Sequence, residues 1–445
     1  MKELKVGFVP IARVNFDIEL AEKNVKSFRS NLILNNLKVI GGDNLVTNQT
    51  MARETAKSLS ESEIDLVLVF QATFADSTIV AEFAKEIDRP IFLWAVPELP
   101  TGGRLRLNSL CGINLAAHAL TLRKVSYNYV YANVNDNQAF AKLRAAAEAA
   151  AVLRRLHRAK LGLVGERPAG MDTCELDSVM LKNKLGVEVI NISLNEVFER
   201  VRSSDMEKIT PIRQKLDNKI ANLSELDQDP LNGTLGTYAV LKQISREKGL
   251  DGIAIRCWPE FFTDLGCSAC GAISLLTDCG IPSSCEADAN GTITQLILHW
   301  LSNASAMGTD IVSVDAEKDQ FIVWHCGLAP LSMADPASQP RGTIHSNRML
   351  PLLMEFPLKP GKVTLARLSQ ATGQLRLVVG TGEMLSAPIS FSGTSGVLRF
   401  ERPAAETLDT ILSEGLEHHI ALTYGNHLSA LIELARMLDM PILRL

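Results

Sequence analysis

The stretch Leu66-Val-Leu-Val-Phe-Gln71 is an unbroken apolar run that ends on a polar residue. Such a run is typical of a strand buried on both faces of a parallel sheet. Residues 4–10, 91–96 and 127–131 follow the same pattern, and the segments between them, residues 18–34, 51–59 and 77–87, carry apolar residues at helical spacing. Strands that alternate with helices in this way predict βαβ units. The first part of the chain is therefore expected to form an α/β domain with a parallel sheet.

The same alternation begins again after residue 158, with predicted strands at residues 160–165, 187–192 and 252–256 and long helices between them. After residue 310 the pattern changes. Residues 363–368, 375–381 and 395–401 alternate apolar and polar positions, as antiparallel strands do. We therefore predict an α/β protein with two Rossmann-like parallel-sheet domains and a β-rich C-terminal domain. The expected boundaries are residues 1–157 for the N-terminal domain, 158–303 for the central domain, and 304–445 for an antiparallel, barrel-like domain with closing helices.

Composition narrows the class of protein. The chain has 445 residues, 46% hydrophobic and 21% charged, with a formal net charge of -5. A slightly acidic chain with dispersed basic residues gives no reason to expect nucleic acid as a partner. No apolar run approaches the roughly 20 residues that a membrane span needs. The N-terminal residues show no signal-peptide pattern, and eight cysteines in a chain of this length are expected to be reduced thiols. We expect a cytoplasmic protein without a membrane partner.

Polar side chains gather where the predicted strands end. In an open α/β sheet, such positions lie at the edge where ligands bind. The loops after these strands would line a cleft for a polar, hydroxyl-rich ligand. The candidate binding residues on them are Arg13, Gln71, Arg104, Arg106, Asn108 and Arg167. Ordinary turn chemistry also places charged residues in such loops, so no single loop decides the function.

A second group of candidates lies later in the chain. Glu286, in Cys285-Glu-Ala-Asp-Ala-Asn-Gly291, is predicted to lie at a turn from a strand to a helix. Asp310 begins the next predicted strand, His325 ends the strand after it, and His419 belongs to the strand near the C-terminus. Two carboxylates and one or two imidazoles suit Mn²⁺, Mg²⁺ or Co²⁺ better than a thiolate-preferring metal. The alternative is that these acids and histidines are ordinary surface or capping groups.

Four motifs, which follow one another in a fixed order along the chain, lie at or near these candidate residues. They are Arg256-Cys-Trp-Pro-Glu260, Ser284-Cys-Glu-Ala-Asp-Ala-Asn-Gly291, Trp324-His-Cys-Gly327 and Gly415-Leu-Glu-His-His-Ile-Ala-Leu-Thr-Tyr-Gly425. Together they resemble the L-fucose isomerase / L-arabinose isomerase superfamily, and most of all its shorter, fucose isomerase-like branch. The resemblance runs the whole length of the chain and includes Leu93-Trp-Ala-Val-Pro-Glu98 and Arg104-Leu-Arg-Leu-Asn-Ser-Leu-Cys-Gly112.

The resemblance implies a metal-dependent aldose–ketose isomerase that works through an enediolate. Glu286 and Asp310 match the two metal-binding acids of the family, which also move the proton between C2 and C1 of the sugar. His419 matches its C-terminal histidine. His325 occupies the place of a further histidine that arabinose isomerases have and fucose isomerases lack, so its role as a ligand stays open. The implied cofactor is Mn²⁺ or another divalent cation such as Mg²⁺ or Co²⁺.

Several further residues are given a role by the resemblance. Asp288, Asp315 and Glu260 are rival acids near the predicted ligands, and we rank them as groups that support the ligands or contact the sugar. Trp258 could stack on a sugar ring or pack in the core. The family assembles as trimers or hexamers in which the N-terminal domain of one subunit closes over the site of its neighbour. This implies a homo-oligomer in which the loops at residues 13–17, 71–76 and 104–114 take part in the site.

The identity of the sugar is left open. Fucose and arabinose are substrates of the superfamily, and its shorter branch includes an enzyme that acts on the sulfonated sugar sulfoquinovose. The arginines of the predicted loops would suit an anionic sugar, because a guanidinium pairs an oxyanion at two points. Arginines also bind neutral hydroxyls, so both substrate classes remain possible.

One alternative belongs to a different class of protein. A non-catalytic sugar-binding protein can also have two α/β lobes, but it would need no cation site.

No G-x-G-x-x-G motif follows a predicted strand, and there is no P-loop motif, which argues against an enzyme that binds dinucleotides or nucleoside triphosphates. The lone motif Cys267-Ser-Ala-Cys270 is interpreted as two small buried residues in a helix.

Overall fold

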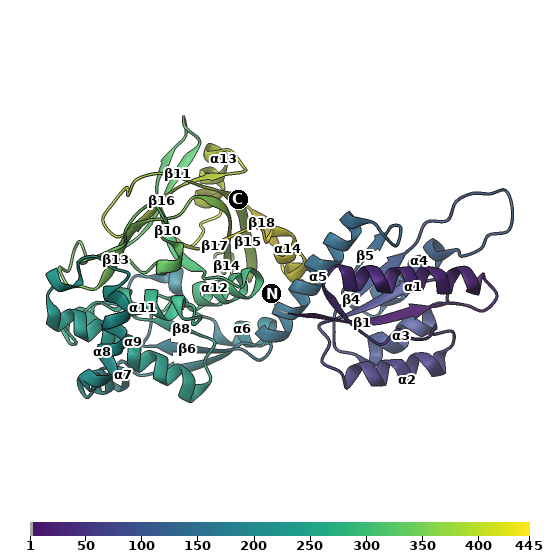
Figure 1. Cartoon of the computed structure of the whole chain (residues 1–445), viewed down its shortest axis with the longest axis horizontal. Coiled ribbons are helices and arrows are strands. Elements are labelled where there is room, and N and C mark those ends of the chain that lie inside the picture. The colour runs from purple at the N-terminus through teal and green to yellow at the C-terminus, as the bar shows by residue number, and fades with distance from the viewer. Residues whose placement is uncertain (1–2) are drawn as a thin grey trace. The chain divides into compact units, whose positions relative to one another are not determined.

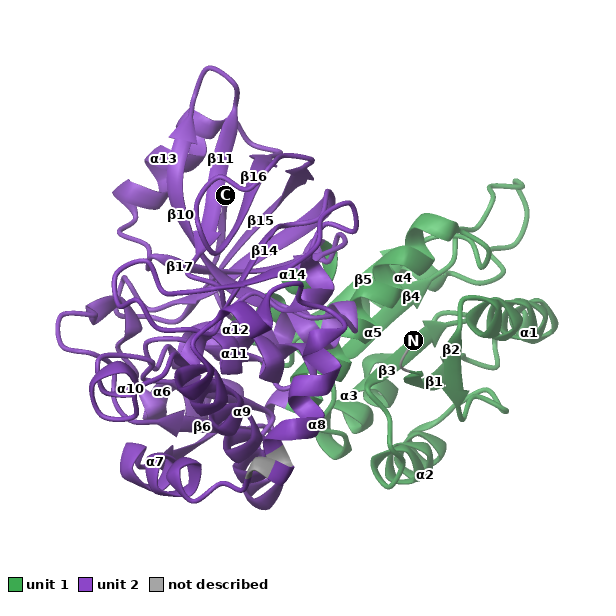
Figure 2. Cartoon of the chain, turned by 60° about the vertical axis from the view of Figure 1, so that its left-hand side comes forward, with its two compact units in different colours: residues 1–155, 429–439 green, residues 156–428, 440–445 purple. Residues whose placement is uncertain are grey.

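The computed structural model describes the main chain of residues 3–445 and the side chains there, except those of residues 206 and 208. It divides into two compact units, which Figure 2 shows in different colours. Unit 1 consists of residues 1–155 and 429–439, and unit 2 of residues 156–428 and 440–445. A segment near the C-terminus therefore belongs to the N-terminal unit.

Unit 1 is built on a five-stranded parallel sheet with the strand order β2-β1-β3-β4-β5. Figure 1 shows its N-terminal strands and helices in purple and blue and its one C-terminal helix in yellow. The strands are β1 (Leu4–Ile11), β2 (Leu37–Ile40), β3 (Leu66–Gln71), β4 (Ile91–Ala95) and β5 (Tyr127–Tyr131). The helices are α1 (Ile18–Leu34), α2 (Gln49–Ser60), α3 (Ser77–Glu86), α4 (Ser109–Leu122), α5 (Asn137–Leu156) and α14 (Leu428–Met437).

Strand β3 explains why this sheet needs helices on both faces. Its alternate residues Leu68 and Phe70 belong to one apolar cluster, whereas Val67 and Val69 belong to another. All residues of the strand are buried, as the unbroken apolar run predicts. Trp94 on β4 is also fully buried, and its indole N–H donates to the carbonyl of Ala132 at 3.0 Å. It is a core residue and does not contact a sugar.

Unit 2 begins with a four-stranded parallel sheet in the order β7-β6-β8-β9. Its strands are β6 (Lys160–Val164), β7 (Glu188–Ile192), β8 (Gly252–Ile255) and β9 (Ser283–Ser284). The helices of this part are α6 (Ser178–Leu185), α7 (Leu194–Arg202), α8 (Met206–Asp217), α9 (Gln228–Lys248), α10 (Glu260–Thr263), α11 (Ala269–Asp278) and α12 (Ala289–Ser302). Helix α12 begins at Ala289, where the Asp288 carboxylate accepts the backbone N–H of Gly291 and caps it.

The rest of unit 2 is a nine-stranded sheet in which six strands close into a barrel. The sheet order is β12-β13-β16-β11-β10-β17-β14-β15-β18, and an additional pairing of β15 with β16 closes the ring. Its elements are β10 (Met307–Asp315), β11 (Gln320–His325), β12 (Arg341–Thr343), β13 (Leu353–Pro357), β14 (Gly361–Ser369), β15 (Arg376–Leu385), β16 (Thr394–Phe400), α13 (Ala404–Ser413), β17 (His419–Tyr424) and β18 (Ile442–Arg444). All neighbouring pairs in the ring are antiparallel. The predicted fold class, two parallel α/β sheets and a barrel-like β-rich region, is confirmed.

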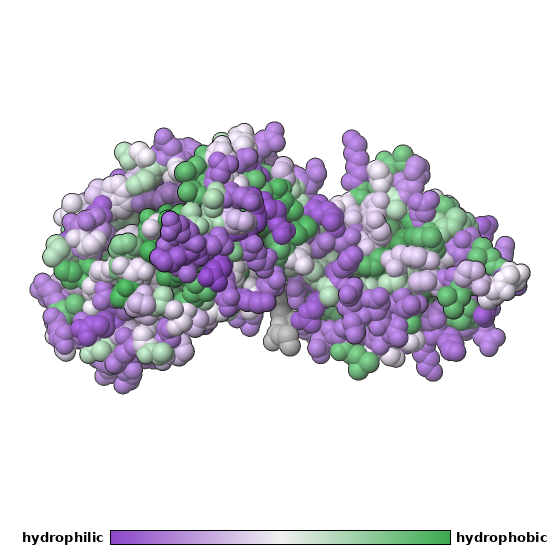
Figure 3. Space-filling model, turned by 90° about the horizontal axis from the view of Figure 1, so that it is seen from above, coloured by the Kyte–Doolittle hydropathy of each residue, from purple (hydrophilic) through white to green (hydrophobic). Residues whose placement is uncertain are grey.

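One buried apolar cluster runs through unit 2. It joins Val164 and Ile255 of the parallel sheet to Leu398 and Leu422 of the barrel. The predicted domain boundary between residues 303 and 304 therefore stays a prediction. No described helix combines the length and the hydropathy of a membrane-crossing segment. On the face seen in Figure 3, hydrophilic and hydrophobic residues are interspersed over each unit.

Candidate metal centre and active site

Glu286 lies in the tight turn between β9 and α12, as the sequence predicts. Glu286 and Ala287 both have left-handed backbones, with φ values of 57° and 54°. For residues other than glycine this conformation costs roughly 1–2 kcal/mol each. The turn is fixed by the Ala287 N–H, which donates to the Ile255 carbonyl of the neighbouring β8 at 2.9 Å. Strain that the surrounding structure holds in place is common at functional sites, and here it directs the Glu286 carboxylate.

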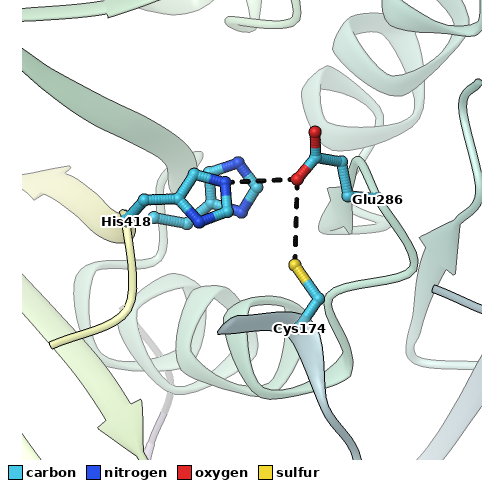
Figure 4. A group of neighbouring side chains, drawn as sticks. Cys174, Glu286 and His418 are labelled. Carbon is cyan, nitrogen blue, oxygen red and sulfur yellow. Dashed lines mark hydrogen bonds and ion pairs between the residues drawn. The ribbon is translucent and has the colours of Figure 1, made fainter. Parts of the chain in front are cut away.

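Three side chains from distant parts of the chain meet the Glu286 carboxylate. The indole N–H of Trp258 donates to Oε1 at 3.0 Å, and His418 Nε2 lies 3.2 Å from Oε2. Cys174 Sγ lies 3.8 Å from the same oxygen. Figure 4 shows Cys174 and His418 on two sides of the carboxylate. Burial acts to raise the pKa of Glu286, but the hydrogen bond with His418, the charge of His419 and the Trp258 hydrogen bond lower it to about 2. Glu286 is therefore an ionised carboxylate at neutral pH.

His419 is held in one tautomer by a buried carboxylate. Its Nδ1 lies 3.1 Å from Asp288 Oδ2, and the guanidinium of Arg367 pairs with the same oxygen. Burial acts to raise the pKa of Asp288, but the charge of Arg367 and the hydrogen bond with His419 hold it well below its usual range. Burial acts to lower the pKa of His419, but its hydrogen bond with the ionised Asp288 raises it, so a cation at Nε2 would take the place of a proton there. Metal-binding histidines commonly have such a carboxylate behind them.

The free nitrogen of His419 faces Asp310. The two residues are directly opposite each other in the pairing of β10 with β17, and His419 Nε2 lies 3.6 Å from Asp310 Oδ1. This oxygen is buried and has no hydrogen-bond partner among the described residues. A buried carboxylate oxygen without a partner, beside an imidazole lone pair, is an arrangement that a divalent cation would complete. The residues present therefore fit a cation of the class expected from the sequence.

A set of possible ligand atoms surrounds the same point. One atom each of Cys174, Glu286, His418 and His419 lies within 4.8 Å of all the others. His418 and Cys174 were missed by the sequence analysis. His418 directly precedes β17, its ring centroid lies 3.9 Å from that of His419, and nothing in a single sequence distinguishes it as a partner of Glu286. Cys174 comes from a one-turn helix at Asp172–Cys174 that no motif marks.

His325 is close to this point but differs from His419 in its hydrogen bonds. The backbone N–H of Cys326 donates to His325 Nδ1 at 2.8 Å, so the neutral ring carries its proton on Nε2. Nε2 lies 3.1 Å from Cys285 Sγ. Burial lowers the pKa of His325 to about 4, so the ring is neutral at pH 7. A protonated Nε2 has no lone pair to offer a metal.

Cys285 is a further neighbour that the sequence analysis missed. Its Sγ lies 3.5 Å from His419 Nε2. A hydrogen bond with Cys257 and burial hold the pKa of the Cys285 thiol well above its usual range. The residue is therefore a neutral thiol when no cation is bound, and its Sγ lies within 4.8 Å of a ring nitrogen each of His325 and His419. In the C-x-x-C motif, both cysteines are buried, but only Cys270 lies in a helix, α11.

Three of the predicted sugar-binding residues lie in unit 2. Trp258 joins the site through its bond to Glu286. Arg167 instead forms ion pairs with Asp172 and Glu175, and Glu260 pairs with Arg256 at 2.7 Å. The charges of Arg167 and Glu260 are thus already balanced by neighbouring side chains. Among the rival acids, Asp288 supports His419, and Asp315 pairs with Lys318 in the turn after β10.

The other five predicted binding residues lie in unit 1, on loops at the carboxyl ends of its strands. Arg13 lies over the ring of Phe74, and Arg104 donates to the carbonyl of Asn15 at 2.7 Å. Arg106 pairs with Asp17 at 2.8 Å. The structure brings these residues together with Gln71, which is buried, and with Asn108, whose N–H donates to Glu98. Their role in a site remains a prediction.

A cavity of about 240 Å³ adjoins the candidate ligands within unit 2. Its polar wall contains Asp310, Arg367, Glu417, His418 and His419, and its apolar wall contains Ile411, Leu412, Leu416 and Leu445. The metal candidates are thus reachable from a hollow in the barrel region.

Comparisons with known proteins match both ends of the chain. Residues 7–157 match the family described as fucose/sulfoquinovose isomerase, N-terminal domain, and residues 324–444 match L-fucose isomerase, C-terminal domain. The sulfoquinovose isomerase of Priestia aryabhattai is 34% identical over 443 residues, which cover 99% of each chain. The sulfoquinovose isomerase of Alkalicoccus urumqiensis is 29% identical over 444 residues, again with 99% of each chain covered. The similarity therefore extends over both units.

Proposed function

Since the chain belongs to the fucose/sulfoquinovose isomerase family and is an aldose–ketose isomerase, we propose that its substrate is the sulfonated aldose sulfoquinovose. The relatives that match over the full length are sulfoquinovose isomerases, which supports this choice over fucose or arabinose. The predicted alternative, a sugar-binding protein without activity, has no observation in its favour. The cytoplasmic location and the trimeric or hexameric assembly expected from the sequence are part of the same proposal.

We propose Glu286, Asp310 and His419 as the cation ligands. The observation that carries this proposal is the convergence of the three groups: Glu286 and His419 present ligand atoms within 4.8 Å of each other, and Asp310 Oδ1 faces His419 Nε2 at 3.6 Å without a partner. Mn²⁺ or a similar divalent cation, when bound there, would polarise the C1 and C2 oxygens of the open-chain sugar and stabilise the negative charge of the enediolate.

His325 is not needed as a ligand in this arrangement. His419 has the acceptor behind it that frees Nε2, whereas His325 has a backbone donor behind it that keeps the proton on Nε2. We propose that His325 instead packs beside Cys285 and holds its ring against the ligand His419, whose centroid is 5.7 Å away. The predicted ligand set is thereby reduced to three residues.

The carboxylates of Glu286 and Asp310 are the groups that we propose to move the proton. Isomerisation removes the proton from C2 and returns one to C1, and a carboxylate within hydrogen-bond reach can do both. The Glu286 carboxylate is oriented by Trp258 and His418, so its oxygens are fixed relative to the sugar. Asp310 Oδ1 is unpartnered and free to accept a proton. The two acids belong to different elements, the turn before α12 and strand β10, and can face the sugar from two directions.

The substrate proposal is tested by turnover of a panel of aldoses with Mn²⁺ present, with the ketose detected by NMR. The panel contains sulfoquinovose, glucose and L-fucose. Glucose is the neutral counterpart of sulfoquinovose, and L-fucose is a known substrate of the superfamily. We expect the highest kcat/KM for sulfoquinovose. A higher value for L-fucose or glucose would contradict the choice of substrate while leaving the isomerase activity in place.

A further inference from the structure

Arg348 is held between aromatic rings beside the candidate active site. It lies in the loop between β12 and β13, and its guanidinium carbon is 5.0 Å from the ring centroid of Trp258 and 5.1 Å from that of Phe262. All three side chains are partly exposed. A guanidinium over an aromatic face is attracted by the ring and loses mobility, so its orientation is set before a ligand arrives.

The charge of this guanidinium is not balanced by an acid. No Asp or Glu among the described residues forms an ion pair with Arg348, and its side-chain partner is His345, whose Nε2 lies 3.3 Å from Arg348 Nη1. His345 is a neutral ring at pH 7, because burial and the charge of Arg348 lower its pKa to about 4. Arg348 thus keeps a full positive charge and several free N–H donors.

The neighbouring arginines of unit 2 differ in this respect. Arg167 pairs with Asp172 and Glu175, and Arg256 pairs with Glu260. Arg367 is buried and pairs with Asp288. Each of these arginines would have to break its ion pair with a carboxylate before it could bind an anion, and breaking the pair costs free energy. Arg348 has no such ion pair to break.

Trp258 connects Arg348 to the reacting end of the substrate. The indole N–H donates to Glu286 Oε1 at 3.0 Å, and the guanidinium of Arg348 lies over the same indole ring. A sugar with its C1 and C2 atoms at Glu286 can therefore direct the other end of its chain toward Arg348. The two partly exposed rings also keep water away from part of the guanidinium, which strengthens a charged contact there.

We propose that Arg348 binds the anionic group of the substrate, the sulfonate at C6 of the sugar. This inference rests on the proposed function, because it names the residue that would distinguish sulfoquinovose from a neutral aldose. A sulfonate offers oxygen atoms that the planar guanidinium can bind at two points. The arginines expected from the sequence to bind an anion were those on the loops of unit 1 and Arg167, and Arg348 was not among them.

The test compares sulfoquinovose with glucose in Arg348→Gln and Arg348→Lys. In Arg348→Gln we expect kcat/KM for sulfoquinovose to fall about 100-fold, mainly through a higher KM, because a charge-assisted contact is lost. The value for glucose should stay within about threefold, since a single neutral contact contributes little. Arg348→Lys keeps the charge without the planar fork, so its loss should be intermediate.

Two control variants make the comparison specific. Arg202→Gln removes an arginine that also lies over an aromatic ring, that of Phe198 at 5.9 Å, but contacts none of the proposed ligands. This variant should leave kcat/KM unchanged for both sulfoquinovose and glucose. Arg104→Gln tests the earlier candidate. Equal losses on both sugars in Arg348→Gln, or a sulfoquinovose-specific loss in Arg104→Gln without one in Arg348→Gln, would overturn the inference.

Calorimetric binding separates this inference from the proposed function. If the wild-type protein turns over neither sugar, the substrate proposal fails. If it still binds sulfoquinovose more tightly than glucose, and Arg348→Gln removes that difference, the assignment of Arg348 stands. If the wild type shows no preference for the sulfonated sugar in binding or in turnover, Arg348 has no sulfonate to recognise and the inference is wrong. Circular dichroism of each variant establishes that it is folded.

Discussion

His419 donates the proton of Nδ1 to a buried Asp288, which lies 3.1 Å away and is itself paired with Arg367. This relationship leaves Nε2 as the nitrogen of His419 that a cation can bind, and Nε2 faces Asp310 Oδ1, which has no hydrogen-bond partner among the described residues. The geometry of the proposed cation site therefore depends on a residue that would not itself touch the cation.

Replacing Asp288 by Asn should weaken cation binding about 10- to 100-fold, because the carboxylate that fixes the His419 tautomer is lost. Asn can still accept the Gly291 N–H and cap α12, so the helix should begin at the same residue. Equilibrium dialysis with Mn²⁺ measures the affinity. Thermal unfolding is recorded alongside, because Arg367 loses its partner. An unchanged affinity in a folded variant would show that Asp288 does not act through His419.

The two histidines should respond differently to the same substitution. His419→Gln should lose about 100-fold or more in Mn²⁺ affinity, because a ligand is removed. His325→Gln should stay within about threefold, because the Cys326 N–H keeps the His325 proton on Nε2. The same dialysis experiment compares the two variants. A large loss in His325→Gln without unfolding would restore His325 to the ligand set.

His345 should make the folded chain less stable as the pH falls from about 6.5 to about 4. Burial and the charge of Arg348 lower its pKa to about 4, and both ring nitrogens face donors, the Asn347 N–H at 3.2 Å and Arg348 at 3.3 Å. In this pH range the unfolded chain binds a proton that the folded chain does not. The stabilisation is thus complete above the ordinary pKa and is lost as the pH falls, by up to about 1.4 kcal/mol per pH unit.

The measurement is Tm at pH 7.5, 6.0 and 5.0 for the wild type and His345→Gln. The wild type should lose more Tm over this range than the variant, which has no proton to take up. Parallel curves would mean that His345 titrates alike in the folded and unfolded chains.

A substitution at Gln71 distinguishes a structural role of this side chain from a role in sugar binding. Its side-chain oxygen is buried and lacks a hydrogen-bond partner among the described residues, and its amide makes one long contact of 3.5 Å with the Ala75 carbonyl. Gln71→Met should therefore leave the stability unchanged or raise it by about 1 kcal/mol. If Gln71 contacts the sugar as predicted, kcat/KM should nevertheless fall. A lower Tm with unchanged kcat/KM would show that the polar group serves the fold instead.

Much of the fold could be predicted because its signals are local. The apolar run of β3 reports its burial directly, whereas the alternation in β14 indicates a strand but not which residues are buried, since Thr364 and Arg367 are buried too. A barrel-like domain was predicted, but the strands that close it could not be, because closure depends on the pairing of β15 with β16, such as Leu385 with Val397, which no local pattern specifies. The short strands β12, β13 and β18 were also missed, since segments of this kind are defined by their partners.

The site was predictable where a motif carried it. Glu286 and His419 were predicted from ordered motifs and Asp310 from the resemblance, and the pairing of β10 with β17 places Asp310 opposite His419. Arg348 was missed because it lies on a loop without a motif, and its importance arises from Trp258 and Phe262, which are far away in the sequence. A resemblance likewise could not separate His325 from His419, since the difference is one backbone hydrogen bond.

The most direct test of the account is sulfoquinovose turnover after the cation is stripped by a chelator and Mn²⁺ is added back, in the wild type, Glu286→Gln and Asp315→Asn. Asp315 is a matched control, an acid at the far end of β10 that pairs with Lys318. We predict that stripping abolishes turnover, that Mn²⁺ restores it in the wild type and in Asp315→Asn, and that Glu286→Gln stays at least about 1000-fold lower. Full turnover by the stripped wild type, or restored turnover in Glu286→Gln, would contradict the proposed site.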